Sequence, residues 1–344
     1  MRRHSYCLFV FVLILAVLSG CKNHKPTTDS LQPSNPLTPA PAATVPKESP
    51  ETDFTYEISQ NGEFVYIKQY IGSSETVVIP SKIQGLPVVT IKGVFENGVL
   101  KRGAFEGCNL KTLLIPDSIK AIGRNAFKDC RNLTDITFSL NIEQILDCAF
   151  ENCIKLKSID LSQTNLQVIF DGAFRGCVAL SEIKFSKSLT EINKNAFYNC
   201  SALMHIDLPE SLTKIHENAF VNCTSLETIS VPKELDLYCL KAPSFYNIPS
   251  LEKIIFKEGR ETITGYAFFD ITSNAEILIP KSVKEFSPAS FFIHGPAKFV
   301  FEGDCPTITD INDFYGNPTI FYNPDTSGWD SCVLQGQIVL QPIH

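Results

Sequence analysis

Two stretches near the middle of the chain are nearly the same sequence: residues 189–208 (LTEINKNAFYNCSALMHIDL) and residues 212–231 (LTKIHENAFVNCTSLETISV). They share Leu-Thr-x-Ile, then Asn-Ala-Phe-x-Asn-Cys, then Leu-x-x-Ile-x-hydrophobic, each at the same offset from the start of its copy. Repetition at a fixed period of roughly 20 to 50 residues is typical of proteins built from stacked structural units. The two copies therefore predict a repeat architecture, with further copies on both sides.

The pattern extends through most of the chain at a nearly constant interval. An Ala-Phe pair, followed by Cys at the third position after the Phe, occurs six times. The copies are Phe105/Cys108, Phe127/Cys130, Phe150/Cys153, Phe174/Cys177, Phe197/Cys200 and Phe220/Cys223. Beyond them the spacing continues at Phe245, Phe268 and Phe291 without the Cys. Upstream, residues 77–79 and 88–91 indicate a degenerate first turn, and residues 95–103 a short insertion.

A unit of about 23 residues has too small a core to fold alone, so units stack and bury a continuous apolar column. The Leu-x-x-Ile-x-Leu segment predicts one short strand per coil, paired in parallel with its neighbours along one face. We predict a repeat solenoid over residues 53–325, mainly β with irregular turns, and a C-terminal cap and tail over residues 326–344. Residues 54–70 and 312–339, rich in aromatic and polar side chains, are the candidate caps.

The N-terminus has the features of a cleaved signal peptide over residues 1–20. Arg2 and Arg3 precede an apolar run from Cys7 to Leu18, which at about 1.5 Å per helical residue is too short to span a membrane. Residues 18–21, Leu-Ser-Gly-Cys, resemble the bacterial lipobox. The resemblance implies that Cys21 receives a diacylglycerol group and becomes the mature N-terminus.

Residues 21–52 are expected to be the lipidated Cys and a proline-rich tether. Seven prolines lie among Thr, Ser, Asn and Ala, with no aromatic residue, so the segment has little apolar surface to bury. Loss of the signal peptide removes two arginines and no acids, which changes the net charge from −7 to −9. An acidic chain argues against nucleic acid as a partner.

The six cysteines of the repeat should form a structural ladder of thiols, because equivalent positions stack in register. Side chains that point the same way make poor disulfide geometry, and a small thiol suits a tight inner corner where it can donate to a backbone carbonyl. Cys148, Cys239, Cys305 and Cys332 lie off this ladder. A Cys305–Cys332 disulfide that closes the C-terminal cap is one pairing, which spacing alone does not decide.

Catalytic and metal-binding signatures are missing from the sequence. His205, His216 and His294 have no ligand-like spacing with Cys or acidic residues, and there is no Cys-x-x-Cys, His-Glu-x-x-His, Gly-x-Ser-x-Gly or phosphate-loop pattern. We therefore expect that the protein is not an enzyme and that it binds no cofactor and no metal ion.

Strand positions that alternate with the core positions should face outward, and these vary from copy to copy. A solenoid presents them as one contiguous surface, where such proteins commonly recognise partners. The candidate binding residues are Asp135, Asp160, Glu182, Lys184, His205 and Asp207.

Three features together resemble the BspA-like leucine-rich repeats: Ile-Pro at strand ends (Ile79-Pro80, Ile115-Pro116, Ile279-Pro280), Leu-x-x-Ile before Ala-Phe, and Asn-Cys or Asp-Cys after it. The resemblance covers roughly residues 54–325. It implies surface exposure and protein binding or adhesion, with host matrix proteins as ligands of some members, but no fixed set of ligand-binding residues. The expected location is the bacterial outer membrane, with the lipid anchor as the only membrane contact.

An alternative function is that of an accessory or structural envelope lipoprotein, for example in glycan capture. An exposed aromatic platform would favour glycan, and the single Trp329 in the expected cap is the only tryptophan that could provide one.

Overall fold

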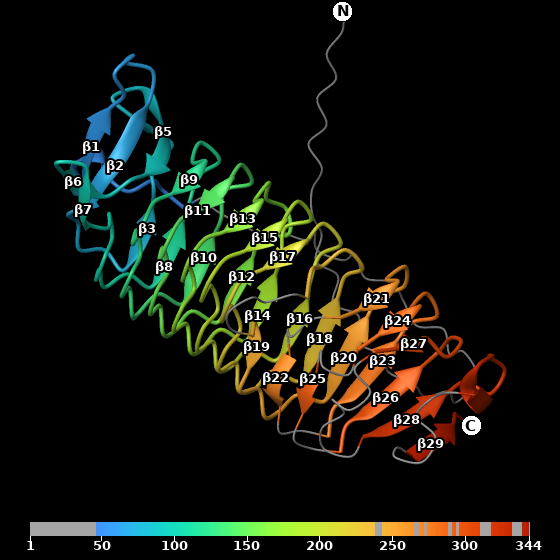
Figure 1. Cartoon of the computed structure of the whole chain (residues 1–344). Helices are drawn as coiled ribbons and strands as arrows, with labels where there is room; N and C mark the ends of the chain where they lie inside the picture. The colour runs from blue at the N-terminus through green and yellow to red at the C-terminus, as the bar shows by residue number, and fades with distance from the viewer. Residues whose placement is uncertain are drawn as a thin grey trace, which may run out of the picture. The chain divides into compact units, whose positions relative to one another are not determined.

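In the computed structural model, the described residues are 46–237, 243–264, 268–271, 274–287, 291–293, 296–309, 318–331 and 339–343. Residues 46–344 form one compact unit, in which coils stack one upon another along the chain (Figure 1). The described residues contain strands, turns and short 3-10 helices but no α-helix. The predicted repeat solenoid is therefore confirmed, whereas the signal peptide, Cys21 and most of the tether lie outside the described residues.

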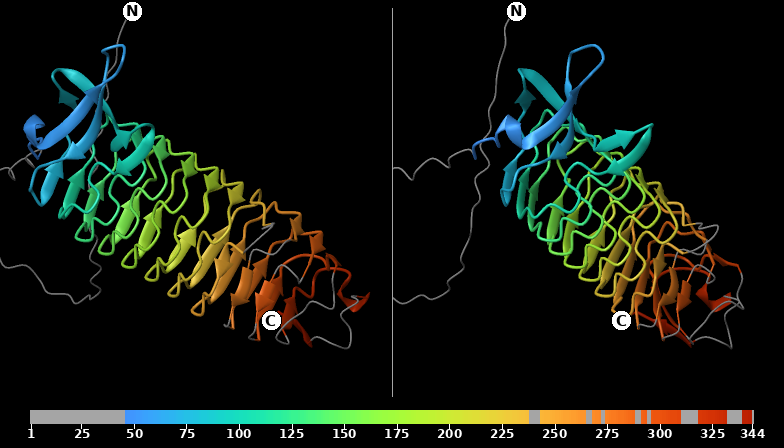
Figure 2. Two further views of the ribbon diagram at one scale, coloured as in Figure 1. Left: turned by 60° about the vertical axis from the view of Figure 1, so that its left-hand side comes forward. Right: turned by 90° about the vertical axis from the view of Figure 1, so that its left-hand side faces the viewer.

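One side of the stack carries the strand that each Leu-x-x-Ile segment predicts, and we call it the β3–β29 side (Figure 2). Its strands are β3 (Thr76–Val78), β8 (Thr112–Leu114), β10 (Asp135–Thr137), β12 (Ser158–Asp160), β14 (Glu182–Lys184), β16 (His205–Asp207), β18 (Thr228–Val231), β20 (Lys253–Phe256), β23 (Glu276–Ile279), β26 (Lys298–Phe301), β28 (Thr319–Tyr322) and β29 (Val339–Pro342). Except between β10 and β12 and between β14 and β16, neighbouring strands pair in parallel, with equivalent residues of successive coils in register.

The second apolar pair of each repeat forms a two-residue strand on another side, the β9–β27 side. These strands are β9 (Ala121–Ile122), β11 (Gln144–Ile145), β13 (Val168–Ile169), β15 (Glu191–Ile192), β17 (Lys214–Ile215), β21 (Thr262–Ile263), β24 (Glu285–Phe286) and β27 (Thr307–Ile308). In the later coils the Phe segment is itself extended, as β19 (Phe245–Tyr246), β22 (Phe268–Ile271) and β25 (Phe291–Ile293).

The N-terminal end is covered by hairpins. After a 3-10 turn, η1 (Glu51–Asp53), strand β1 (Phe54–Ile58) pairs antiparallel with β2 (Val65–Tyr70), which pairs in parallel with β5 (Leu86–Ile91). Strand β4 (Lys82–Ile83) pairs with the start of β5. The predicted insertion is a hairpin of β6 (Val94–Glu96) and β7 (Val99–Arg102) around an Asn97-Gly98 turn with positive φ at both residues, which suits this residue pair.

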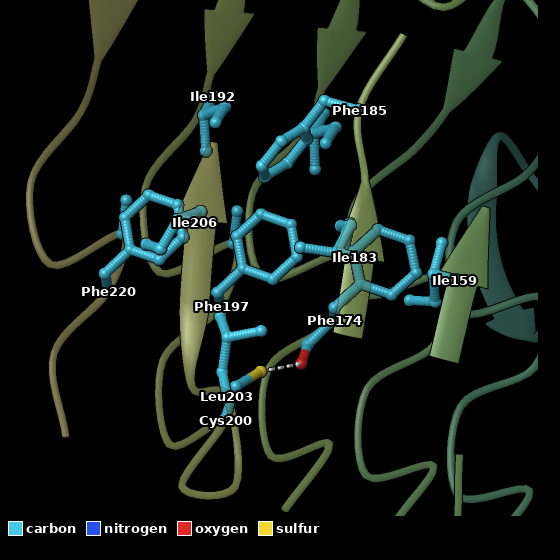
Figure 3. Packing of buried hydrophobic residues seen from close by; sticks show 14 of the residues in the cluster. Ile159, Phe174, Ile183, Phe185, Ile192, Phe197, Cys200, Leu203, Ile206 and Phe220 are labelled. Atoms are coloured by element: carbon cyan, nitrogen blue, oxygen red, sulfur yellow. Dashed lines mark hydrogen bonds between the residues drawn. The ribbon is translucent and has the colours of Figure 1, made fainter. Parts of the chain in front are cut away.

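A column of stacked aromatic rings fills the centre of the coils. Phe174 and Phe197 are nearly parallel, with ring centroids 5.4 Å apart, and equivalent pairs continue from Phe105 to Phe291 at 4.8 to 5.4 Å. Tyr70 extends the column into the N-terminal cap, at 5.2 Å from Phe105. Neighbouring rings and inward isoleucines bury one another, and the column phenylalanines from Phe105 to Phe291 are at most 3% exposed (Figure 3), so no coil has a core of its own.

Asparagine and glycine recur because each of the five coils from Phe127 to Phe220 turns twice through the left-handed region. The residue before Ala-Phe has positive φ at Asn125, Asn195 and Asn218, and so does the residue before Cys, as at Asn199. Asn and Gly adopt this region at low cost, which explains the Asn-Ala-Phe-x-Asn-Cys pattern.

At the other end, Trp329 lies in the 3-10 turn η4 (Trp329–Ser331) and is 4% exposed. Its Nε1 donates to the Gly303 carbonyl at 3.2 Å, and its ring packs on Phe301. Trp329 therefore covers the end of the core, and it does not provide the exposed platform that would favour glycan.

Candidate functional site

The predicted outward residues lie on the surface of the β3–β29 side, on four consecutive strands. Asp135, Asp160, Glu182, Lys184, His205 and Asp207 are all exposed, while the inward isoleucines between them are buried or nearly so. Lys184 lies opposite Asp160 in the β12–β14 pair, with its Nζ 3.5 Å from the Asp160 carboxylate and 3.6 Å from Glu182.

The sheet on this side is split at two places. Strand pairing joins β3, β8 and β10, then β12 and β14, then β16 and all later strands, but not β10 to β12 or β14 to β16. The second split separates Glu182 and Lys184 from His205 and Asp207. On the β9–β27 side, β15 and β17 of the same two coils pair in register, so the split is confined to one side.

Both splits follow a strand that ends in Phe-Ser, at Phe138-Ser139 and Phe185-Ser186, rather than Ile-Pro or Leu-Pro. Each Phe ring packs edge-on against the column ring of the next coil, Phe185 against Phe197 at 5.9 Å. Where Leu208 stands instead, its amide bonds to the Ser230 carbonyl of the next strand. A ring at this position does not by itself split the sheet, because Phe256 packs edge-on against Phe268 in the same way and β20 still pairs with β23.

A surface pocket of about 500 Å³ opens at the β14–β16 split. Ile183 and Phe185 contribute apolar surface, and charged side chains of β14, β16 and the following turns surround it. Ile183 and Phe185 are each 7% exposed, whereas Ile159 and Ile206 at the same position as Ile183 are 1% and 2% exposed. The volume lies within the range of small ligand pockets.

Lys257 crosses the surface from a later coil and joins this site, although the sequence analysis did not single it out. Its Nζ lies 3.0 Å from the Asp207 carboxylate and 3.1 Å from Glu210. Partial burial lowers the pKa of Lys257, but hydrogen bonds to Asp207 and Glu210 outweigh this effect and leave the pKa above its ordinary value. The contact joins the end of β20 to the end of β16 past the intervening β18, and no local pattern reveals it.

Asp160 is held ionised beside the pocket. Partial burial raises the pKa of the Asp160 carboxyl, but hydrogen bonds from Ser162 and the neighbouring Lys184 outweigh it, and the pKa lies below its ordinary value.

Five of the six ladder cysteines are fully buried, and each thiol donates to the carbonyl of the column Phe one coil earlier. Figure 3 shows one such bond, from the Cys200 thiol to the Phe174 carbonyl, at 3.3 Å. Burial raises the pKa of Cys177 and of Cys223 to about 12. These thiols are neutral and shielded, so they serve packing rather than chemistry.

Cys108 differs from the prediction of a buried ladder member, because it is half-exposed and no acceptor for its thiol is found among the described residues. It belongs to the first complete coil, where Tyr70 of the cap replaces the preceding Phe.

The cysteines off the ladder occupy other positions. Cys148 takes the left-handed position that Asn or Gly occupies elsewhere, with φ 53°. Cys305 is half-buried, and Cys239 and Cys332 lie outside the described residues.

No group of three or more His, Cys, Asp or Glu side chains in the described part of the chain is arranged to hold a metal ion. His216 contacts Glu191, and His205 lies 3.9 Å from Glu227; His294 is outside the described residues. A second surface hollow, of about 720 Å³ and more polar than the pocket at the β14–β16 split, lies near Glu227, Glu252 and Glu276. Among the described residues, no helix has the length and apolar character needed to cross a membrane.

Comparison with known proteins identifies the repeat. Residues 99–220 and 190–318 match the family described as BspA type leucine rich repeat region, with six copies. No curated protein matches the chain.

Among solved structures, a leucine-rich repeat protein of T. pallidum is 28% identical over 61% of this chain and 86% of its own, with a TM-score of 0.43. A leucine-rich cell surface protein of Faecalibacterium prausnitzii is 20% identical over 88% of this chain and 96% of its own, with a TM-score of 0.43. A leucine-rich repeat protein of Bacteroides ovatus is 17% identical over 85% of this chain and 98% of its own, with a TM-score of 0.30. The family match spans more than half of the sequence, and the chain belongs to the BspA-type leucine-rich-repeat family.

Proposed function

We propose that this protein is a non-catalytic, lipid-anchored protein of the bacterial cell surface that binds another protein through its β3–β29 side. The observation that carries the proposal is the contrast between the two sets of strand residues. The inward residues repeat and are buried, whereas the outward residues differ from coil to coil and are exposed in a fixed array. An array of this kind on a stacked scaffold suits recognition of an extended partner surface.

The site around β14 and β16 favours a protein partner over a glycan. It combines both signs of charge with an apolar pocket, which matches the mixed chemistry of a protein surface. The one tryptophan is buried in the C-terminal cap. Host extracellular matrix proteins are the first partners to test, because the family resemblance points to them.

Residues 46–344, which form one compact unit, can be immobilised and exposed to solubilised extracellular matrix and mucus, with bound proteins identified by mass spectrometry. We expect one or a few proteins to be retained by this domain and not by a domain whose exposed strand residues are alanine. If both domains retain the same proteins, binding through this side is excluded.

Surface location is tested separately by protease treatment of intact cells. A surface protein is degraded while a periplasmic control survives. Survival of the protein alongside that control would indicate a periplasm-facing accessory protein instead.

A further inference from the structure

The corners between the ladder position and the following strand form a strip along one edge of the solenoid. Figure 3 shows one such corner, from Cys200 to Leu203. Successive corners stack, because donors of one corner bond to carbonyls of the corner before it. Such bonds are the Ser181 amide to Lys157 at 2.9 Å, the Ser201 hydroxyl to Val178 at 3.3 Å and the Glu227 amide to Met204 at 2.8 Å. We define the corner strip as residues 131–134, 154–157, 178–181, 201–204, 224–227 and 249–252.

Charge changes sign along the corner strip. The first two corners contain three basic residues and no acidic one, the middle two contain no charged residue, and the last two contain two acidic residues and no basic one. These charged residues are Arg131, Lys155, Lys157, Glu227 and Glu252. Arg131 is paired with Asp129 at 3.3 Å, whereas Lys155, Lys157 and Glu252 form no ion pair with any described residue. One end of the strip is therefore positive and the other negative.

The two rows that border the strip, the residue before the ladder position and the first strand residue, keep this polarity. Asp129 and Asp135 border the first two corners, and Lys253 borders the last two. With these residues counted, the first half still has one more basic than acidic residue, and the second half one more acidic than basic residue. Glu182, beside the middle, is paired with Lys184.

The uncharged middle of the corner strip is apolar and exposed. Ile154, Val178 and Met204, from three consecutive coils, are 37%, 42% and 45% exposed. Ala179 and Ala202 lie beside them and are half-buried. A contiguous exposed apolar patch with polar surroundings is typical of an interaction site.

The acidic half of the strip is concave. Glu227 and Glu252 line the surface hollow of about 720 Å³, whose other charged residues are Glu276 and Lys298. Carboxylates therefore outnumber ammonium groups in this hollow. The basic half presents exposed lysine side chains instead, which have the length and charge to enter such a hollow.

The corner strip is complementary to a reversed copy of itself. Its coils follow one another at the 5.1 to 5.4 Å spacing of the column rings, so two antiparallel strips match coil for coil. A two-fold axis between the coils of Phe174 and Phe197 places the coil of Phe150 opposite that of Phe220. Lys157 then faces Glu227 of the second copy, because both residues are the fourth after the ladder cysteine. The apolar residues meet around the axis, which gives the self-complementary contact of a two-fold dimer.

We propose that two copies of this protein associate antiparallel through the corner strip, with Lys157 of each copy paired to Glu227 of the other. Burial of the apolar middle supplies affinity, while the opposed charges fix direction and register. Six coils span about 25 Å at the spacing of strands in a sheet, so the interface is small and the dimer reversible. The inference concerns a second copy of the chain and does not depend on the proposed protein partner.

The first test is sedimentation velocity of residues 46–344 at concentrations from about 5 to about 500 µM. We expect the sedimentation coefficient to rise from that of a monomer to that of a dimer over this range. Raising the salt concentration from about 0.1 to about 0.5 M should increase the dissociation constant at least about threefold, because salt screens the paired charges. A monomer at every concentration overturns the proposal.

Charge reversal tests the pairing itself. Lys157→Glu and Glu227→Lys each create two like-charged contacts in a dimer and should each stay monomeric up to about 500 µM. An equimolar mixture of the two variants should dimerise, because each contact then joins opposite charges. Lys214→Glu makes the same change on the exposed part of β17, outside the strip, and should dimerise as wild type does. Melting temperatures show that all variants fold.

The apolar middle is tested by Val178→Ser with Met204→Ser, which should raise the dissociation constant at least about tenfold. An unchanged constant would rule out an apolar contact at the axis. A wild-type dimer that Lys157→Glu leaves intact overturns the proposed interface, and so does a mixture of the two reversal variants that stays monomeric while wild type dimerises.

Discussion

Replacing Cys177 with alanine tests the thiol ladder in the middle of the stack. The Cys177 thiol is fully buried and donates to the Phe150 carbonyl at 3.2 Å. The same carbonyl also accepts the Cys153 amide at 3.2 Å, so alanine leaves no unpaired carbonyl behind. The loss is therefore limited to one weak hydrogen bond and the packing of one sulfur atom.

A neutral hydrogen bond contributes about 0.5 to 1.5 kcal/mol, and a thiol belongs at the low end of that range. Removing a buried atom the size of a methylene costs about 1 kcal/mol. We expect the free energy of unfolding to fall by between about 1 and 2 kcal/mol. The matched control is Cys108→Ala at the half-exposed start of the ladder, which should cost less than about 0.5 kcal/mol.

The assay is urea denaturation of residues 46–344 followed by far-ultraviolet circular dichroism. Tryptophan fluorescence is unsuitable, because the single Trp329 reports on the C-terminal cap. Equal effects of the two substitutions would refute the reasoning. So would ladder cysteines found as disulfides by peptide mapping under non-reducing conditions.

Three further outcomes are expected. Burial raises the folded-state pKa of Cys177 from an ordinary value of 9.0 to about 12. The contribution of this thiol to stability is therefore complete below pH 9 and is lost as the pH rises toward 12. In that window, urea denaturation should show wild type losing stability more steeply than Cys177→Ala, by about 1.4 kcal/mol per pH unit. Cys148→Asn should raise stability by up to about 1 kcal/mol, since Asn tolerates the left-handed backbone of Cys148 better, and an unchanged or lower melting temperature would contradict this. Cys21→Ser should abolish metabolic labelling with palmitate and leave a slower-migrating precursor, and equal labelling of both proteins would exclude lipidation at this residue.

The sequence was sufficient to predict the solenoid because its determinants are local and repeated. The column Phe recurs from copy to copy, and in the six copies from Phe105 to Phe220 the thiol and the inward strand residue also keep their places, so one copy explains the others. The outward residues of β14 and β16 followed from the same alternation. Even the left-handed turns are visible as recurring Asn and Gly, and they identify the position of Cys148 once the copies are aligned.

The details of the site depend on contacts between coils. Phe185-Ser186 is visible as a departure from the Leu-Pro ending, but this does not reveal that β14 and β16 are unpaired, because β20 also ends in a Phe and still pairs with β23. Lys257, at the end of β20, reaches Asp207 of β16 past the intervening strand β18. Cys108 and Trp329 depend on what lies at the two ends of the stack, where no repeat supplies a precedent.

The most direct test of protein binding through the β3–β29 side is the affinity of a variant with alanine at Glu182, Lys184, His205 and Asp207 for a protein ligand recovered from matrix or mucus. These four side chains are exposed, so circular dichroism and the melting temperature should match wild type. Exposed charges contribute little one at a time, so each single substitution should cost less than about 1 kcal/mol, while the fourfold variant should bind at least about tenfold more weakly. Wild-type affinity in the fourfold variant would contradict the proposal that this face is the binding site.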